Sequence, residues 1–177
     1  MEELKAVSDL LTDGKFVAYL VDQRQKALLR VASTILIEVT GGRLGFAEGF
    51  RVIDRTANLA RGPKTLSGGE GFLASLALAL ALVEIAGRSG GTLDALFLDE
   101  GFGSLDATSL GLAMDALEQR AVNGRLVLLI SHVRAVAEHV DTVLRVTRTP
   151  SGSQAQYLEG TERLDFLESE LEAGLLS

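Results

Sequence analysis

Two short apolar runs constrain the fold of this chain more than any other feature. Ala95–Leu98 leads into Asp99, and Leu126–Ile130 is apolar at every position. Continuous apolar runs of this length are typical of parallel strands that are covered on both faces. Residues 106–121, between the two runs, carry apolar side chains at helical spacing (Leu110, Met114 and Leu117). A strand, a helix and a strand in this order form a βαβ unit, so the sequence predicts an α/β fold with a parallel sheet.

The residues before this unit predict helices and a hairpin. Residues 2–12 and 16–39 are predicted as helices, separated by a break or cap at Thr12-Asp13-Gly14. In the second helix, apolar residues recur at three- and four-residue spacings (Leu28, Val31, Ile35 and Val39). The glycines at positions 41 and 42 end that helix. Short alternating stretches over residues 44–52 then predict a hairpin.

The segment Glu70–Ala86 has features of both a strand and a helix. Leucine and alanine alternate strictly over residues 76–82, as in a strand, but both are strong helix formers and no β-branched residue occurs before Val83. Because the segment is also long for a strand, we predict a helix. Further along, residues 149–153 predict a turn or linker, and residues 161–175 predict an acidic helix with leucines on one side.

The composition excludes several classes of protein. The absence of cysteine excludes disulfides, thiol catalysis and cysteine-based zinc sites, and the presence of only two histidines in 177 residues argues against a histidine-rich metal site. The net charge of −7 argues against a surface that grips nucleic acid on all sides. The longest apolar run, residues 72–83, is shorter than a membrane span, so we expect a buried helix and no membrane contact. The acidic start Met1-Glu2-Glu3 does not predict a secretory signal, and a cytoplasmic location is expected.

The strongest local motif is Leu66-Ser67-Gly68-Gly69-Glu70, at the start of the predicted helix. The N-terminus of a helix presents unpaired N–H groups and the positive end of a dipole, and so binds phosphate readily. Glycines allow an anion to approach the backbone closely, and the Ser67 hydroxyl adds a donor. On its own, the motif fits a serine N-cap in front of a core helix equally well.

Polar residues follow both predicted strands. Asp99 and Glu100 end the first strand, where Asp99 could hold Mg²⁺ through water and Glu100 could orient and deprotonate an attacking water. Ser104-Leu105-Asp106 comes directly afterwards. His132 follows the second strand, where it could donate a hydrogen bond to a phosphoryl oxygen. Taken singly, acids and a histidine at strand ends are more often ordinary surface residues.

The order of these motifs resembles one family. Ser-Gly-Gly-Glu, a long helix, a strand ending in Asp-Glu, Ser-Leu-Asp, a helix, a strand and Ser-His follow one another as in the C-terminal half of ABC-type ATPases. Within that group, the chain resembles the SMC-like branch and, in it, the bacterial SbcC exonuclease-subunit family. Segments 65–82 and 96–106 look like that family's signature helix and its acidic strand with D-loop. Phe16–Leu20 is similar too, so the resemblance spans about residues 8–150. Gly71 departs from it, since threonine or a similar residue is expected there.

This resemblance implies a fold and a nucleotide site. The implied fold is α/β, the C-terminal lobe of a P-loop (ABC-type) NTPase head, with a parallel sheet, flanking helices and an N-terminal coiled-coil stub. The implied cofactors are ATP and Mg²⁺. Residues Ser67, Gly68 and Gly69 would contact the γ-phosphate of a nucleotide held by an opposite head. Glu70 belongs to the same binding motif, and Asp106 would cross the dimer interface.

The resemblance also implies how the ATPase reaction is catalysed. Asp99 would serve Mg²⁺, Glu100 would polarise the attacking water, and His132 would sense the γ-phosphate. The sequence nevertheless contains no G-x-x-x-x-G-K-[ST] loop to cradle the phosphates. The closest string, Gly62-Pro63-Lys64-Thr65, follows no apolar strand and is interpreted as a turn. We therefore expect that the chain does not hydrolyse ATP alone.

In the family, a long coiled coil separates the two halves of the head, so the resemblance implies that this chain is the returning half. Residues 1–40 would then be the end of the coiled-coil arm and the first head helix, 41–150 the C-terminal lobe, and 151–177 an extension without an assigned function. The implied partners are the N-terminal half of the same head, a second head in an ATP-dependent dimer, an SbcD-type nuclease subunit, and DNA bound by the full complex. The implied location is the cytoplasm, in association with the nucleoid.

Two other functions stay open at this stage. One is a binding and dimerisation module that supplies its motifs to a partner and has no activity of its own. The other is a fragment of the ATPase subunit of an ABC transporter. Against the transporter, the signature motif is followed by an alanine- and leucine-rich helix rather than by a basic, glutamine-rich stretch. The DNA substrate and the nuclease chemistry of the complex do not follow from the sequence.

Overall fold

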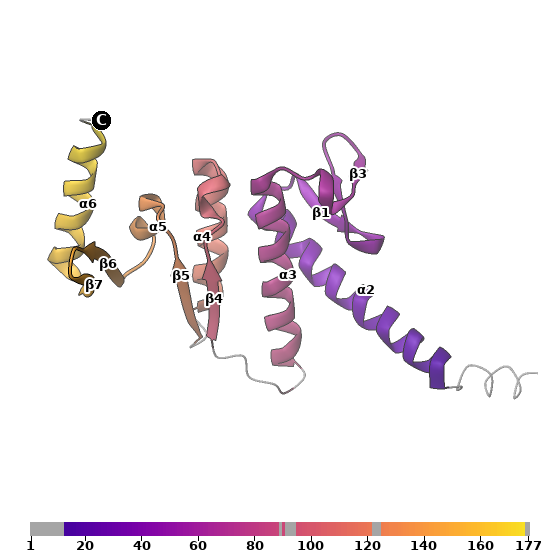
Figure 1. The fold of residues 1–177 in the computed structure, drawn as a ribbon. Helices are drawn as coiled ribbons and strands as arrows, with labels where there is room; N and C mark the ends of the chain where they lie inside the picture. Colours follow the sequence, from indigo (N-terminus) through magenta and orange to yellow (C-terminus); the bar gives the residue numbers. More distant parts are fainter. Residues whose placement is uncertain (1–12, 89, 91–94, 122–124, 176–177) are drawn as a thin grey trace, which may run out of the picture.

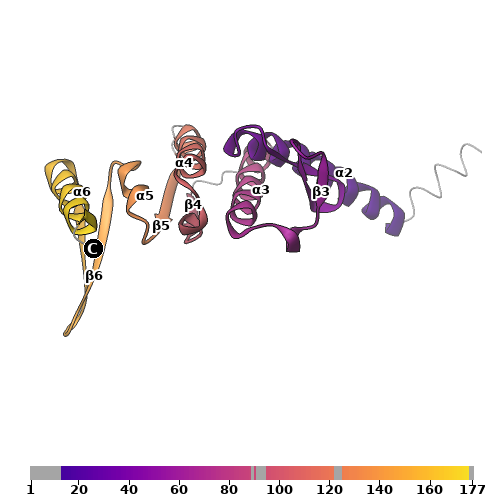
Figure 2. The same cartoon turned by 90° about the horizontal axis from the view of Figure 1, so that it is seen from above.

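The structure is a computed structural model that describes the chain except for residues 1–12, 89, 91–94, 122–124 and 176–177. Its elements follow one another across an elongated molecule, from a long helix with a small antiparallel sheet, through a βαβ unit, to a hairpin with a final helix (Figures 1 and 2). The observed α/β architecture, with a parallel strand pair beside helices, confirms the predicted fold class.

Helix α2 (Asp13–Val39) has different surroundings at its two ends. Its C-terminal half is buried in the core through apolar residues at helical spacing (Ala32, Ile35, Leu36 and Val39). Its N-terminal part extends away from the rest of the molecule (Figure 1) and exposes large apolar side chains (Phe16, Val17, Tyr19, Leu20 and Val21). Helix α2 includes Asp13 and Gly14, so no break lies at these two residues, whereas Thr12, where the predicted break or cap begins, lies outside the described residues. The predicted helix 2–12 lies outside the described residues.

An antiparallel sheet follows α2. The predicted hairpin over residues 44–52 is confirmed as β1 (Leu44–Ala47) paired with β2 (Arg51–Asp54). A third strand, β3 (Leu59–Arg61), pairs with β2 and was not predicted, because three residues are too few to show a period. Through this pairing Arg61 lies opposite Val52 at the edge that faces the start of the next helix.

Helix α3 (Gly68–Arg88) is the centre of the core, and the prediction of a helix over residues 70–86 is confirmed. Its buried side chains pack against α2 and belong to the apolar cluster that α4 also joins (Leu73, Ala74, Leu76, Ala77, Leu80 and Ala81). The helix is longer than the apolar run alone, and by length and composition its 21 residues would suffice to cross a membrane. We assign it to the core, because its buried face forms the largest share of the apolar cluster.

The predicted βαβ unit is confirmed. Strand β4 (Ala95–Asp99) runs parallel to β5 (Leu126–Ile130), and α4 (Ala107–Ala121) connects them. The expectation that both faces are covered is wrong for the described residues. One face packs on the core (Leu96, Leu98, Val127 and Leu129), whereas the alternate residues on the other face are exposed (Phe97, Leu126, Leu128 and Ile130).

The C-terminal part contains structure that the sequence analysis did not predict. After the short helix α5 (Arg134–Glu138), β6 (Val143–Thr149) and β7 (Gly152–Leu158) form a hairpin, and the predicted turn or linker at 149–153 is its turn. Helix α6 (Gly160–Leu175) follows, close to the prediction. The expected division between residues 150 and 151 thus falls in the turn of a paired hairpin.

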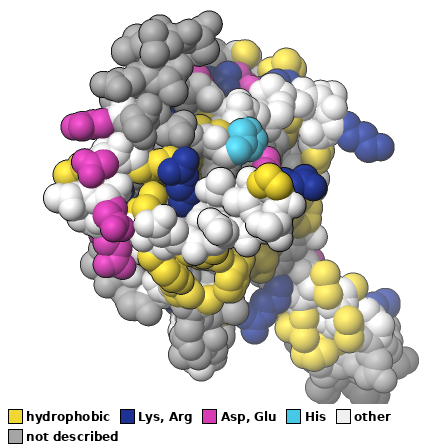
Figure 3. Space-filling model, turned by 60° about the vertical axis from the view of Figure 1, so that its left-hand side comes forward, with side chains coloured by type: hydrophobic (Ala, Val, Ile, Leu, Met, Phe, Trp, Pro, Cys, Tyr) yellow, Lys and Arg dark blue, Asp and Glu magenta, His cyan; other side chains and the backbone are white. Residues whose placement is uncertain are grey.

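On the face that Figure 3 shows, hydrophobic side chains lie open to solvent between acidic and basic ones.

Two aromatic rings join the start of α3 to the loop after β4. Phe72 and Phe102 meet edge to face, with ring centroids 4.9 Å apart, and Phe102 is buried. Gly101 has a φ of 98°, and a Cβ atom built on it would overlap the Phe72 ring. Only glycine fits this close approach with this backbone conformation.

We predict that Gly101→Ala destabilises the chain by about 1–3 kcal/mol, because it adds both a clash and an unfavourable φ. The matched control is Gly111→Ala within α4, where a Cβ atom meets nothing within 4 Å. That change should raise the free energy of unfolding by about 0.5–1 kcal/mol. Urea unfolding measures the free energy of unfolding of both variants. Equal changes in the two variants would contradict the close packing of Gly101 on Phe72.

Candidate functional site

The start of α3 is held by a reciprocal capping arrangement. The Ser67 hydroxyl oxygen accepts a hydrogen bond from the backbone N–H of Glu70, at 3.2 Å, and the Glu70 carboxylate accepts one from the backbone N–H of Ser67, at 3.0 Å. The N-cap interpretation of Ser67 is therefore confirmed. Ser67 and Gly68 are exposed at this helix start, and the Ser67 N–H is the donor that Glu70 occupies. The Ser67 hydroxyl still has a proton to donate, so capping does not exclude a contact with an anion.

Glu70 is the most buried charged residue of this region, with 9% of its surface exposed. Arg43 donates to Oε1 at 2.8 Å, and Arg61 donates to both carboxylate oxygens, at 2.9 and 3.1 Å. The Oδ2 atom of Asp54 lies 4.0 Å from Nη1 of Arg43 and 3.9 Å from Nη2 of Arg61. Two acids and two arginines therefore form one compact cluster, which we call the Glu70 cluster.

The hydrogen bonds from Arg61 are the main cause of a lowered pKa at Glu70, which falls to about 2 from an ordinary value of 4.5. The Ser67 N–H and the charges of both arginines act in the same direction, against the opposing effect of burial. Glu70 is thus negatively charged at neutral pH and fully engaged within the chain. A direct contact between this carboxylate and a phosphate would be repulsive, so Glu70 serves the motif as a holder of its geometry.

The loop after β4 touches the glycines of the motif. A Cβ atom on Gly69 would lie only 2.7 Å from the carbonyl oxygen of Ser104, so this close approach requires glycine. A Cβ atom on Gly68 would lie 3.6 Å from Ser104 Cβ. The segment 101–106 therefore packs directly on the first turn of α3.

Asp99 and Glu100 lie at the carboxyl end of β4. Asp99 is the last residue of the strand, lies opposite Ile130 and is exposed. Glu100 has a φ of 61°, in the left-handed region that residues other than glycine rarely adopt. Its N–H donates to the carbonyl oxygen of Ile130 at 2.9 Å, which holds this conformation. The turn directs Glu100 away from the strand and toward the end of β5.

His132 meets Glu100 at this edge of the sheet. Its Nδ1 lies 3.3 and 3.4 Å from the two carboxylate oxygens of Glu100. A Cβ atom on Gly103 would lie 3.5 Å from His132 Nε2, so the ring also borders the loop. Both side chains are mostly exposed, at 73% for His132 and 60% for Glu100, and so remain open to an incoming group.

Asp106 caps helix α4. Its carboxylate accepts hydrogen bonds from the N–H of Ser109, at 2.8 Å, and from the Ser109 hydroxyl, at 3.0 Å. These bonds lower the pKa of the exposed Asp106 carboxyl below its usual value. The predicted site residues therefore gather around one loop, 100–106, which contacts the start of α3 on one side and His132 on the other.

Arg43 and Arg61 were missed by the sequence analysis. They lie 27 and 9 residues from Glu70, at the ends of strands, and no motif spacing connects them to it. The only signal was charge: each arginine flanks a short apolar strand ahead of the acid. The predicted turn at Gly62–Thr65 is confirmed, since Pro63–Thr65 form a single turn of 3-10 helix, and the short strand β3 comes directly before it.

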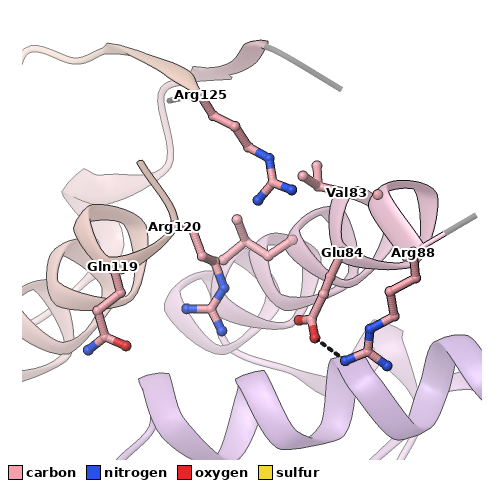
Figure 4. Close-up of a pocket in the computed structure, with 8 residues that line it drawn as sticks. Val83, Glu84, Arg88, Gln119, Arg120 and Arg125 are labelled. Carbon is pink, nitrogen blue, oxygen red and sulfur yellow. Dashed lines mark hydrogen bonds and ion pairs between the residues drawn. The ribbon is translucent and has the colours of Figure 1, made fainter. Parts of the chain in front are cut away.

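A cavity of about 470 Å³ lies at the opposite ends of α3 and α4 and shares no residue with these motifs (Figure 4). Its charged side chains are partly balanced. Arg88 pairs with Glu84 at 2.6 Å, and Arg120 pairs with Glu38 at 3.1 Å. We therefore place the candidate site at the start of α3 and the carboxyl ends of β4 and β5, where the polar groups converge.

Known proteins resemble this chain in sequence. The family model described as SbcC/RAD50-like, Walker B motif, matches residues 48–119. The SbcC subunit of the nuclease SbcCD from Deinococcus radiodurans is 35% identical over 165 residues, which cover 90% of this chain and 18% of that protein. Its counterpart from Rhodobacter capsulatus is 40% identical over 142 residues, 80% of this chain and 10% of that protein. The chain belongs to the SbcC/RAD50-like family. It spans less than a fifth of the length of these relatives.

Solved structures show the same fold. A structure from work on the ATP-driven dimerization and DNA-stimulated activation of SMC ATPases matches with a TM-score of 0.69 at 16% identity, over 85% of this chain and 95% of that one. The Smc head domain from Pyrococcus furiosus, with an extended coiled coil and bound to the C-terminal domain of ScpA, matches with a TM-score of 0.64 at 17% identity. That match covers 95% of this chain and 43% of the other, so most of residues 155–177 lie within the shared fold.

We predict that the Glu70 cluster makes stability depend on pH. Because the folded-state pKa lies below the ordinary value, the stabilisation is complete above about pH 4.5 and is lost as the pH falls toward about 2. Wild type should exceed Glu70→Gln in free energy of unfolding by on the order of 2–3 kcal/mol near neutral pH, and the gap should close in acid. Glu118→Gln, on the exposed side of α4, is the control. A gap that stays constant with pH would argue against the cluster.

Proposed function

We propose that this chain supplies the C-terminal half of an ATP-binding and ATP-hydrolysing head of an SbcC-type protein, which acts with a nuclease in the repair of DNA double-strand breaks. The observation that carries the proposal is the gathering of the motif residues around the loop 100–106. The start of α3, with its backbone and hydroxyl donors, lies on one side of this loop. His132, which pairs with Glu100 of the loop, lies on the other side. The match to 43% of a Smc head chain that also carries an extended coiled coil supports the division into halves.

The donors at the start of α3 fit an anionic phosphate. Gly68 and Ser67 are exposed, and the first turn of a helix leaves N–H groups without partners inside the helix. Ser67, Gly68 and Gly69 would therefore bind the terminal phosphate of an ATP molecule held by a second head, while Glu70 holds their geometry. Asp106, exposed beside this surface, would lie at the same interface between heads.

Asp99 and Glu100 divide the work at the end of β4. Asp99 would hold Mg²⁺, which as a hard cation prefers oxygen ligands and neutralises phosphate charge when it is bound. In the described residues no group of three or more acids or histidines could hold a metal, so Asp99 would act together with the nucleotide and the other half. Glu100 would accept the proton of the attacking water. His132, held by Glu100, would contact the terminal phosphate.

We infer that the N-terminal half of the head covers the open face of the parallel strands. The outer face of β4 and β5 exposes four large apolar side chains, although parallel sheets are normally covered on both faces. A lobe that carries the missing phosphate-binding loop would cover this face. The full complex would add a second head, an SbcD-type nuclease subunit and DNA, in the cytoplasm and in association with the nucleoid.

The comparisons disfavour a transporter fragment, since the relatives described above are nuclease subunits and SMC heads. A binding module without activity of its own differs from our proposal only in the behaviour of the isolated chain, and it is included in the following test.

We predict that the isolated chain binds Mg-ATP weakly or not at all, because the sequence has no phosphate-binding loop with its lysine. Coexpression with the N-terminal half of the same protein should produce a complex that binds and hydrolyses ATP. Calorimetry and a phosphate-release assay measure both properties. Low-micromolar binding by the isolated chain would mean that it contains a further nucleotide site. A complete but inactive head would refute the proposed ATPase function.

In the complete head, Glu100→Gln should preserve ATP binding and slow hydrolysis by about 10²–10⁴-fold, because the amide cannot accept a proton from water. Heads should then accumulate as ATP-bound dimers, which size-exclusion chromatography with ATP detects. The control is Glu118→Gln, which lies on the exposed side of α4. Hydrolysis by Glu100→Gln at the wild-type rate would show that Glu100 is not the base.

A further inference from the structure

The Glu70 cluster joins two separate elements to the proposed phosphate site. Arg43 precedes β1 and Arg61 ends β3, and both donate to a carboxylate that in turn binds the N–H of Ser67. Arg61 is 25% exposed and Arg43 is 47% exposed. The antiparallel sheet is therefore fastened to the first turn of α3 through one side chain, Glu70.

The charges of this cluster bear directly on anion binding. Glu70 is the third residue of α3, one position beyond the two glycines whose N–H groups would face a phosphate. A carboxylate without a compensating positive charge, so near in the chain to these glycines, would repel an anion bound there. Within the cluster, the positive charges of Arg43 and Arg61 balance the negative charges of Asp54 and Glu70. Removal of one arginine would leave a net negative charge beside the helix start and would free the carboxylate to rotate.

We propose that Arg43 and Arg61 are positioning residues for the nucleotide. They hold Glu70 against the N–H of Ser67 and cancel its charge, so that the exposed N–H groups of the first turn of α3 attract the terminal phosphate bound by the opposite head. This inference rests on the proposed function and adds to it the sheet β1–β3 as the support of the phosphate contact. Arg61 is the stronger element, because it binds both oxygens of Glu70.

The test compares Arg61→Gln with Arg51→Gln in the complete head. Arg51 lies on the same sheet, is exposed and donates to the carbonyl oxygen of Ala60 at 2.7 Å. Arg61→Gln should raise the ATP concentration that is needed for half-maximal pairing of heads by about tenfold, a loss typical of a charged hydrogen bond. The maximal hydrolysis rate at saturating ATP should fall much less, since Glu100 and His132 are untouched. Arg51→Gln should behave as wild type. Equal ATP requirements for all three proteins would overturn the inference.

A second pair of variants separates charge from packing. Arg61→Gln combined with Glu70→Gln removes one positive and one negative charge, so it should restore most of the ATP affinity lost in Arg61→Gln alone. Asp54→Asn leaves the cluster with a net positive charge and should not weaken pairing. The electrostatic role is refuted if the double variant pairs heads with ATP as weakly as Arg61→Gln and Asp54→Asn also weakens pairing. The cluster would then serve only to hold the fold.

Hydrogen exchange on the isolated chain tests the positional part without ATP. The N–H of Ser67 is bound to Glu70, so Arg61→Gln should speed its exchange severalfold, while Arg51→Gln should leave it unchanged. Unchanged exchange in Arg61→Gln overturns the inference even if the head is an active ATPase. Faster exchange together with a complete head that never hydrolyses ATP would leave the positional role standing and refute the proposed function instead.

Discussion

The burial of helix α3 is the constraint on which the rest of the structure depends. Its alanine and leucine side chains pack against α2. Phe72, near the start of α3, packs against Phe102 in the loop after β4. This position presents the first turn of α3 to the segment 101–106, where Gly69 approaches Ser104 too closely for any side chain. The core helix and the candidate site are thus parts of a single packing arrangement.

The chemistry of the site is distributed over elements that are far apart in the sequence. The Glu70 carboxylate that caps Ser67 is held by Arg43, directly before the antiparallel sheet, and by Arg61, in its third strand. Glu100 is held in its unusual backbone conformation by a carbonyl oxygen of β5. The parallel strands themselves have one apolar face open. Under the proposed function, the N-terminal half of the head covers this face.

Several features of the fold and of the site could be predicted from the sequence. The βαβ unit, the hairpin at 44–52 and α3 followed from patterns of apolar residues and from helix propensity within short windows. Strand β3 and the β6–β7 hairpin did not, since short strands show few periods and the latter is exposed on most of its length. The open face of β4 and β5 was also missed, because a continuous apolar run does not reveal which of its faces is covered.

The sequence by itself determined the family and the candidate site residues: the order of Ser67-Gly68-Gly69-Glu70, Asp99-Glu100, Asp106 and His132 is typical of this family. Only the tertiary structure decided what Glu70 does. Its partners are Arg43, directly before β1, and Arg61, the last residue of β3, and contacts between residues distant in the chain leave no periodic signal in the sequence. Local order is encoded in neighbouring residues, whereas a buried charge finds its partners only when the chain has packed.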